Sequence, residues 1–74
     1  MDAISVGIKL KAMRGSRLQA KVAADLGISK SAIAMYENGE RVPKDDIKIA
    51  IAKYYGTTVG SLFFDERSGG NREA

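Results

Sequence analysis

The chain has 74 residues, with 12 lysines and arginines against 9 aspartates and glutamates, a net charge of +3, and neither cysteine nor histidine. This length allows one small domain, which buries only about 60% of the surface of its unfolded chain. Without cysteine and histidine the chain has no disulfide framework, no thiolate metal site and no imidazole to serve as a metal ligand or general base. We therefore expect no metal, no cofactor and no enzymatic activity.

The sequence does not have the features of a membrane or secreted protein. No stretch approaches the roughly 18 apolar residues that span a bilayer. An aspartate, Asp2, stands where a signal peptide would carry lysine or arginine. We expect a soluble protein located in the cytoplasm.

Apolar residues recur at helical spacing along the chain, and no alternating strand pattern is found. A first helix is predicted over residues 4–13, because Val6, Leu10 and Met13 fall on one face, and Gly15 then breaks it. Basic residues are concentrated in this part of the chain. Such a run is typical either of a surface that binds an anionic partner or of an ordinary solvated face. No acid lies among its five members, which are Lys9, Lys11, Arg14, Arg17 and Lys21.

A second and a third helix follow with a very short connection. The second is predicted over residues 18–26, and Gly27 stands where a left-handed C-cap residue belongs. Ser29 is a good N-cap for the third helix, which Gly39 ends. Val42 then adopts an extended conformation, because it precedes a proline. The inner stripe of the second helix consists of Val22, Ala23 and Leu26.

A fourth helix and a short fifth helix complete the predicted fold. Asp45 and Asp46 suit the positive end of the fourth helix dipole, and Gly56 closes this helix. Thr58 caps the fifth. The inner face of the fourth helix is predicted as Ile47, Ala50, Ile51, Tyr54 and Tyr55, and the fifth helix carries Val59, Leu62 and Phe63.

The last ten residues, DERSGGNREA, have no apolar side chain except the final alanine. We expect residues 65–74 to be a disordered tail, and residues 1–64 to form one domain. The fold class is therefore all-α, with five helices packed into a compact domain.

The second and third helices together have the pattern of a helix-turn-helix, in which the second helix of the motif enters the major groove of DNA. On a helical wheel the outer side of the third helix is small and polar. A helix that enters a groove about 12 Å wide needs such side chains there. An ordinary solvent-facing stripe on a small helical bundle is the alternative. The outer residues are Ser31, Ala34 and Asn38, flanked by Lys30 and Met35.

The stretch QAKVAADLGISKSAIAMYENGERVP resembles the helix-turn-helix of the Cro/cI (Xre) family of transcription regulators. The resemblance extends over roughly residues 5–64 and implies a lambda-repressor-like fold. The spacing of all the matching positions taken together identifies the family more specifically than any single residue does. The matching positions are Gln19, Ala23, Gly27, Ile28, Ile33, the run Glu37, Asn38 and Gly39, and Pro43.

The resemblance also implies roles for individual residues. For Ser29 and Asn38 the alternative is simple helix capping, and for Gln19 and Lys30 it is solvent exposure. Arg14 and Glu37 match positions that form an ion pair between the first and third helices. The implied base contacts are Lys30, Ser31 and Met35, and the implied contacts with the DNA backbone are Gln19, Ser29, Asn38, Arg17 and Arg41.

Two features depart from the family pattern. Family members usually carry serine or threonine before the glutamine of the second helix, but this chain has Leu18. The N-cap is then expected from Ser16 or from the backbone of Arg17. The loop from Arg14 to Gln19 is also shorter than usual, so Arg17 either reaches a phosphate or points into water.

The function implied by the resemblance is sequence-specific binding of double-stranded DNA, most simply as a repressor on a two-fold symmetric operator. One alternative is a protein-interaction module, such as an antitoxin or anti-regulator, that keeps the same fold. Another is a small enzyme, which the lack of histidine, cysteine and a glycine-rich phosphate loop argues against. No small-molecule substrate and no membrane partner are expected.

We also expect a homodimer, because one helix-turn-helix reads only a few base pairs. A two-fold dimer places two recognition helices about 34 Å apart on one face of the duplex. The fourth and fifth helices leave apolar residues for such a contact after their core positions are filled. These residues are Ile49 and Phe64, with Phe63 as a further candidate.

Overall fold

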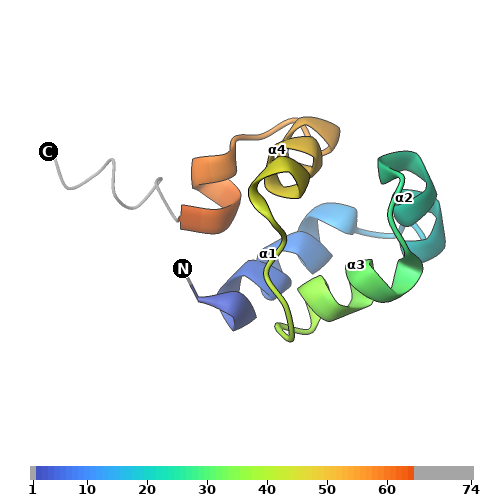
Figure 1. Cartoon of the computed structure of the whole chain (residues 1–74), viewed down its shortest axis with the longest axis horizontal. Helices are drawn as coiled ribbons and strands as arrows, with labels where there is room; N and C mark the ends of the chain where they lie inside the picture. The colour runs from blue at the N-terminus through green and yellow to red at the C-terminus, as the bar shows by residue number, and fades with distance from the viewer. Residues whose placement is uncertain (1, 65–74) are drawn as a thin grey trace, which may run out of the picture.

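The computed structural model describes residues 2–64, and all regular structure in this range is helical (Figure 1). The prediction of an all-α fold with five helices is confirmed. Predicted and observed helix ends differ by about one residue, and the predicted disordered tail, residues 65–74, lies outside the described residues. The elements are α1 (Ala3–Arg14), α2 (Gln19–Leu26), α3 (Lys30–Glu37), α4 (Asp45–Tyr54) and the π-helical turn η1 (Gly60–Phe64).

Polar side chains begin three of these elements. Asp2 accepts a hydrogen bond from the backbone amide of Ser5 at the start of α1 (3.2 Å). Ser29 accepts one from the amide of Ala32 in α3 (3.0 Å). The Thr58 hydroxyl does the same for the amide of Ser61 (3.0 Å). The predicted caps of the third and fifth helices are therefore confirmed.

The helices enclose two adjoining apolar clusters. In the larger one, Val6 and Leu10 of α1 pack against Tyr36 of α3 and against α4 and η1. The smaller one joins α2 to α3 through three buried residues, Val22, Ala23 and Ile33. Because Val22 and Ile33 are almost completely buried, the two helices of the motif cannot change their angle without exposing this cluster.

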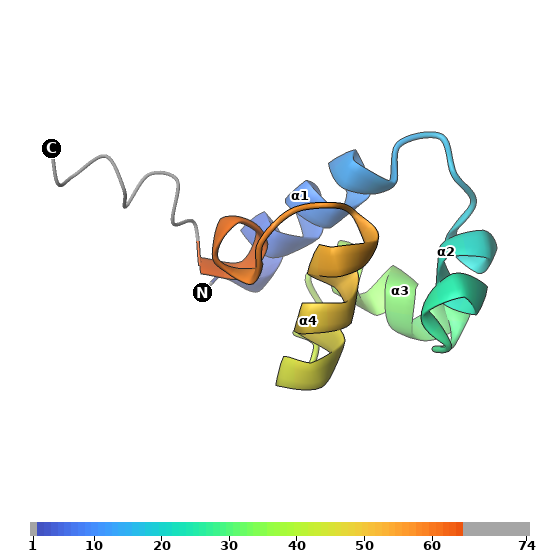
Figure 2. The same ribbon diagram turned by 90° about the horizontal axis from the view of Figure 1, so that it is seen from above.

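The elements are arranged so that α2 and η1 lie at opposite ends of the molecule (Figures 1 and 2). At one end α2 packs beside α3. At the other, η1 lies beside α1, and the Lys9 ammonium near the middle of α1 donates to the carbonyl of Ser61 (3.2 Å). The segment between α3 and α4 passes across α1 in the view of Figure 1.

A glycine allows α1 to approach the end of α3 very closely. Gly7 is buried, and a Cβ atom built on it would clash with the Glu37 carbonyl and lie 2.7 Å from the Tyr36 carbonyl. These are backbone atoms of α3, which cannot rotate away as a side chain could. Only glycine fits at this crossing.

The inner face of α4 differs in part from the prediction. Ile51 is buried as expected, and Ile47, Ala50, Tyr54 and Tyr55 are half-buried. Two further residues, Lys48 and Ala52, are buried although the sequence did not indicate it. The Lys48 ammonium lies 3.5 Å from an Asp45 carboxylate oxygen and 5.2 Å from the ring centre of Phe64.

The prediction that Phe63 belongs to an exposed dimer surface is wrong. Its side chain is 2% exposed and is among the most deeply buried in the described chain. Phe63 and Leu62 are both part of the larger apolar cluster, in which η1 packs against α1. Ile49 and Phe64 are each 52% exposed, as that prediction requires.

Candidate nucleic-acid interface

The turn between α2 and α3 has the geometry that the sequence predicted. Gly27 adopts a left-handed conformation (φ 72°, ψ 30°) that ends α2. The Ile28 amide donates to the Ala23 carbonyl (3.0 Å), so the chain turns within two residues. Ser29 then begins α3. The two helices therefore form a helix-turn-helix held by short backbone hydrogen bonds.

One side of α3 is buried and the other is open. Ile33, Tyr36 and Glu37 face the interior. On the outer side Lys30 and Ser31 are exposed, and so is Asn38, the C-cap residue; Ala34 and Met35 are half-buried. The residues predicted to read bases thus share one side of α3. Two of them, Lys30 and Ser31, lie in the first turn of this helix.

The predicted ion pair between α1 and α3 is present. Arg14 donates from Nε to Glu37 Oε2 (2.7 Å) and from Nη2 to Glu37 Oε1 (3.0 Å). The Glu37 side chain is 3% exposed and that of Arg14 is 15% exposed. Two parallel hydrogen bonds between planar groups fix both distance and orientation. The pair therefore fixes the position of the C-terminal end of α3 relative to α1.

Gln19 joins this pair and is not simply exposed. Its Nε2 donates to Glu37 Oε1 (3.0 Å), and its side chain is half-buried. The alternative of solvent exposure is therefore wrong for Gln19. Its hydrogen bond connects the start of α2 to the end of α3.

The charge of Glu37 is stabilised by this network. Burial alone would raise the pKa of the Glu37 carboxyl, but hydrogen bonds from Arg14 and Gln19 lower it further than burial raises it. The net pKa lies below the ordinary value of 4.5. Glu37 is therefore an anion throughout the physiological range and holds two donors in place.

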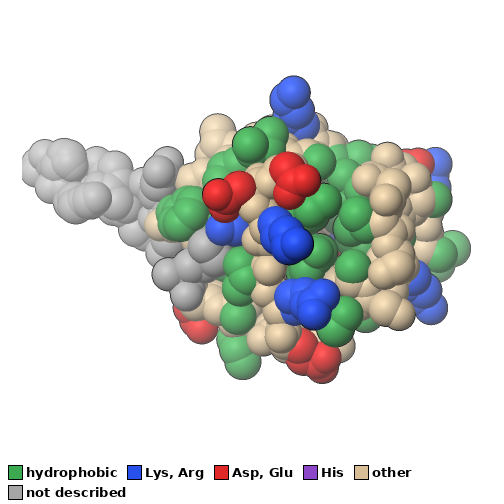
Figure 3. All heavy atoms as spheres, viewed as in Figure 1, with side chains coloured by type: hydrophobic (Ala, Val, Ile, Leu, Met, Phe, Trp, Pro, Cys, Tyr) green, Lys and Arg blue, Asp and Glu red, His purple; other side chains and the backbone are tan. Residues whose placement is uncertain are grey.

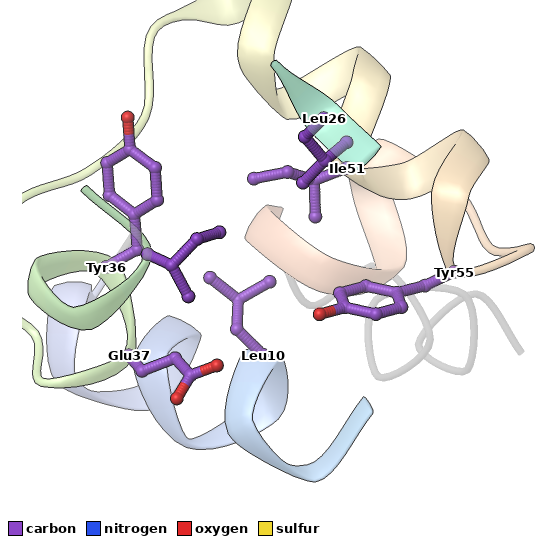
Figure 4. Close-up of a pocket in the computed structure, with 7 residues that line it drawn as sticks. Leu10, Leu26, Tyr36, Glu37, Ile51 and Tyr55 are labelled. Carbon is purple, nitrogen blue, oxygen red and sulfur yellow. The ribbon is translucent and has the colours of Figure 1, made fainter. Parts of the chain in front are cut away.

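Glu37 also lines a small cavity in the core (Figure 4). Its volume is about 10 Å³, which is too small for any ligand. Glu37 is its one charged lining residue, and Figure 4 shows this carboxylate at the edge of the apolar group. The lining residues are Leu10, Leu26, Ile33, Tyr36, Glu37, Ile51 and Tyr55.

Arg17 occupies a position that neither alternative described. Its guanidinium carbon lies 5.2 Å from the ring centre of Tyr55 and 5.6 Å from that of Tyr54. Nη2 donates to the Met13 carbonyl (2.9 Å) and Nε to the Arg14 carbonyl (3.2 Å). The side chain is thus held between the end of α1 and α4, and a contact with a phosphate stays a prediction.

The expected N-cap of α2 is also different. Leu18 itself is the N-cap residue, and its side chain makes no capping hydrogen bond. Its carbonyl accepts from the amides of Lys21 and Val22 (3.1 Å each). The prediction of a cap from Ser16 or Arg17 is therefore wrong, because the helix begins at Gln19, two residues later than a cap at Ser16 would allow and one later than a cap at Arg17 would.

A link between α2 and α4 was not predicted from the sequence. The Tyr54 hydroxyl donates to Asp25 Oδ2 (2.6 Å), and Lys21 pairs with Asp25 Oδ1 (3.1 Å). Both contacts lower the pKa of the Asp25 carboxyl. Tyr54 was assigned to the core by its spacing, and no sequence signal indicated that its hydroxyl would reach the motif.

The face of the molecule drawn in Figure 3 carries side chains of both charges. On the face seen in Figure 3, Lys and Arg side chains are interspersed with Asp and Glu. Arg41, a predicted backbone contact, is exposed in the segment between α3 and α4. Ser29 serves as the cap of α3, which does not conflict with its predicted contact with a phosphate.

Within residues 2–64, no group of three or more carboxylates, histidines or cysteines is placed to bind a metal ion. In the same range no helix is both long enough and apolar enough to cross a bilayer.

Comparison with known proteins gives one match. Residues 10–62 match the model of a protein family described as helix-turn-helix, and the matched range is more than half of the chain. No curated protein sequence and no solved structure gives a significant match. The match contains all of α2, α3 and α4. The chain therefore belongs to the Cro/cI (Xre) type of helix-turn-helix family, whose members are DNA-binding transcription regulators, and has its lambda-repressor-like fold.

Proposed function

We propose that this protein binds a specific duplex sequence and acts as a repressor by occupying its operator. The observation that carries this proposal is the asymmetry of α3, whose inner side is fixed by the core and by the Arg14–Glu37 pair while its outer side is exposed. Occupancy of the operator is sufficient for repression. No catalytic step is required, and we propose none.

Within this proposal the side chains divide into two groups. Lys30 pairs with a guanine, because a lysine ammonium suits the O6 and N7 acceptors of that base in the major groove. Ser31 and Met35 contact neighbouring base edges. The side chains proposed to contact phosphates, which orient the protein on the duplex, are Gln19, Ser29, Asn38, Arg17 and Arg41.

We also propose that two copies bind a two-fold symmetric operator. Ile49 and Phe64 are each 52% exposed, and Phe64 belongs to η1, at the end of the molecule away from α2. A contact between these residues of two chains would leave both recognition helices open. Scattered exposed apolar residues are common, so the pairing needs a direct test.

Selection of bound fragments from random duplex DNA tests the function. The proposal predicts an enriched consensus with two-fold symmetry. Each neutralised phosphate contributes about −0.9 to the slope of log affinity against log salt, so we expect a slope steeper than about −3 for the operator complex. No enrichment together with a flat salt dependence would contradict the proposal and favour a protein-interaction module.

Sedimentation tests the dimer. Two chains should sediment with one operator, and Phe64→Glu should weaken this pairing without lowering the melting temperature, because the side chain is exposed. One chain per operator would contradict the dimer. Unchanged pairing in the variant would contradict only this surface.

A further inference from the structure

Leu18 and Lys44 are the N-cap residues of α2 and α4, and neither makes a side-chain capping hydrogen bond; of the two, only Leu18 is apolar. At 72% exposure it is the most exposed large apolar residue in residues 2–64. It occupies the N-cap position of α2, where a serine, threonine, aspartate or asparagine side chain would accept a hydrogen bond from the first turn. Asp2 and Ser29 do this for α1 and α3. At position 18 the chain has instead an apolar side chain in water.

The surroundings of Leu18 connect it to the recognition helix. It lines a shallow hollow of about 440 Å³, whose other lining residues are Arg14, Gln19, Ala20 and Lys30. Gln19 begins α2, and Lys30 begins α3. The hollow therefore joins the two helix starts that the proposed function directs toward DNA, and Leu18 is its largest apolar side chain.

We infer that Leu18 contacts the C5-methyl group of a thymine in the major groove, beside the base pair that Lys30 reads. This inference rests on the proposed function. The thymine methyl is the apolar group that base edges present in the major groove, and apolar side chains recognise it by direct contact. Such a contact removes the exposed surface of Leu18 from water. It adds a specificity-determining residue that lies outside α3.

The inference predicts opposite effects of one substitution on folding and on binding. Leu18→Ser supplies the missing side-chain cap of α2, so its melting temperature should equal or exceed that of the wild type. Affinity for the selected consensus duplex should nevertheless fall about 5- to 20-fold, the lower part of the range expected for one lost base contact. Ile8→Ser is the matched control. Ile8 is 65% exposed on α1 and does not line the hollow, so this variant should bind as the wild type does.

Parallel selections from random duplex DNA identify the contact. The wild type and Leu18→Met, which keeps an apolar side chain, should enrich a thymine at one position of each half-site, and Leu18→Ser should not. Replacing that thymine with deoxyuridine removes only the methyl group. It should weaken wild-type binding and leave Leu18→Ser unchanged.

Two results would overturn the inference. One is an identical consensus for the wild type and Leu18→Ser. The other is an equal loss of affinity by Leu18→Ser on every sequence, which would place Leu18 against deoxyribose. In both cases the wild-type consensus would still stand, so the proposed function would survive. If the wild type itself enriched no sequence, the proposed function would fail first.

Discussion

The two ends of α3 differ in what surrounds them. At the C-terminal end Glu37 is almost fully buried, paired with Arg14 and hydrogen-bonded to Gln19, and the backbone lies directly against Gly7. At the N-terminal end Lys30 and its neighbours are exposed. One end of the helix is therefore held from three directions, and the other faces solvent.

This difference separates orientation from recognition. The held end sets the direction of α3 through contacts within the chain, and it makes no proposed contact with a base. The open end carries Lys30 and Ser31, two of the three side chains proposed to read bases, and contributes little to the core. The third, Met35, lies on the outer side of α3 between the two ends. Changes at the held end should therefore affect stability and DNA binding together, whereas changes at the open end should affect binding alone.

The largest effect is expected at the crossing of α1 and α3. Gly7→Ala places a methyl group against two backbone carbonyls of α3, so the helices must separate. We expect a loss of about 2 to 3 kcal/mol in the free energy of unfolding, the size typical of overpacking. Ile8→Ala, on the exposed side of α1, is the control and should change stability little. Urea denaturation measures both. Helix propensity alone predicts the opposite, a gain of up to about 1 kcal/mol for Gly7→Ala, and that result would contradict the close approach.

The next effect concerns the ion pair. Glu37→Ala leaves the Arg14 guanidinium without its carboxylate in a largely buried position, and we expect a loss of about 2 kcal/mol. For a domain of this size that corresponds to a fall of about 10 °C in melting temperature. DNA affinity should fall as well. A double-mutant cycle with Arg14→Ala isolates the coupling, and simple additivity of the two substitutions would contradict an energetic role for the pair.

At the open end, Lys30→Ala should change binding without changing folding. We expect a loss of about 1 to 3 kcal/mol on the selected duplex, a much smaller loss on random duplex, and an unchanged melting temperature. Titrations on the two duplexes measure the difference. Equal losses on both would show that Lys30 contacts phosphate and does not read a base.

A smaller effect should appear as a dependence on pH. Because the pKa of Glu37 is lower in the folded chain than in the unfolded chain, its contribution to stability is present above the ordinary value of 4.5. That contribution is lost as the pH falls below 4.5 and through the folded-state pKa. Glu37→Gln removes this titration, so its unfolding free energy should decrease less steeply over the same acid range. Parallel pH profiles of the wild type and the variant would contradict the assignment.

Sequence patterns predicted the features that depend on neighbouring residues. Apolar spacing located the helices, and Gly27 and Ser29 located the turn, because backbone conformation and capping are decided within a few residues. The Arg14–Glu37 pair was predicted through the family resemblance. Helical spacing alone would not have placed these two side chains in contact, since they lie 23 residues apart.

The remaining features depend on contacts between distant segments. Lys48 was not among the residues predicted for the inner face of α4, but it is buried, and its ammonium lies over the rings of Phe63 and Phe64 in η1. Phe63 is buried because η1 packs against α1 and places this ring in the larger apolar cluster. The positions of Arg17 and of the Tyr54 hydroxyl were set by tertiary packing, which no local pattern encodes.

The most direct test of the separation between the two ends of α3 is an NMR titration of the labelled protein with its selected duplex. We expect the largest amide shifts, and intermolecular NOEs, at the starts of α2 and α3, around Gln19, Lys30 and Ser31. The amides of α4 and the buried interior should shift little. Shifts and NOEs concentrated on α4 or on the exposed side of α1, with the open end of α3 unchanged, would contradict the account.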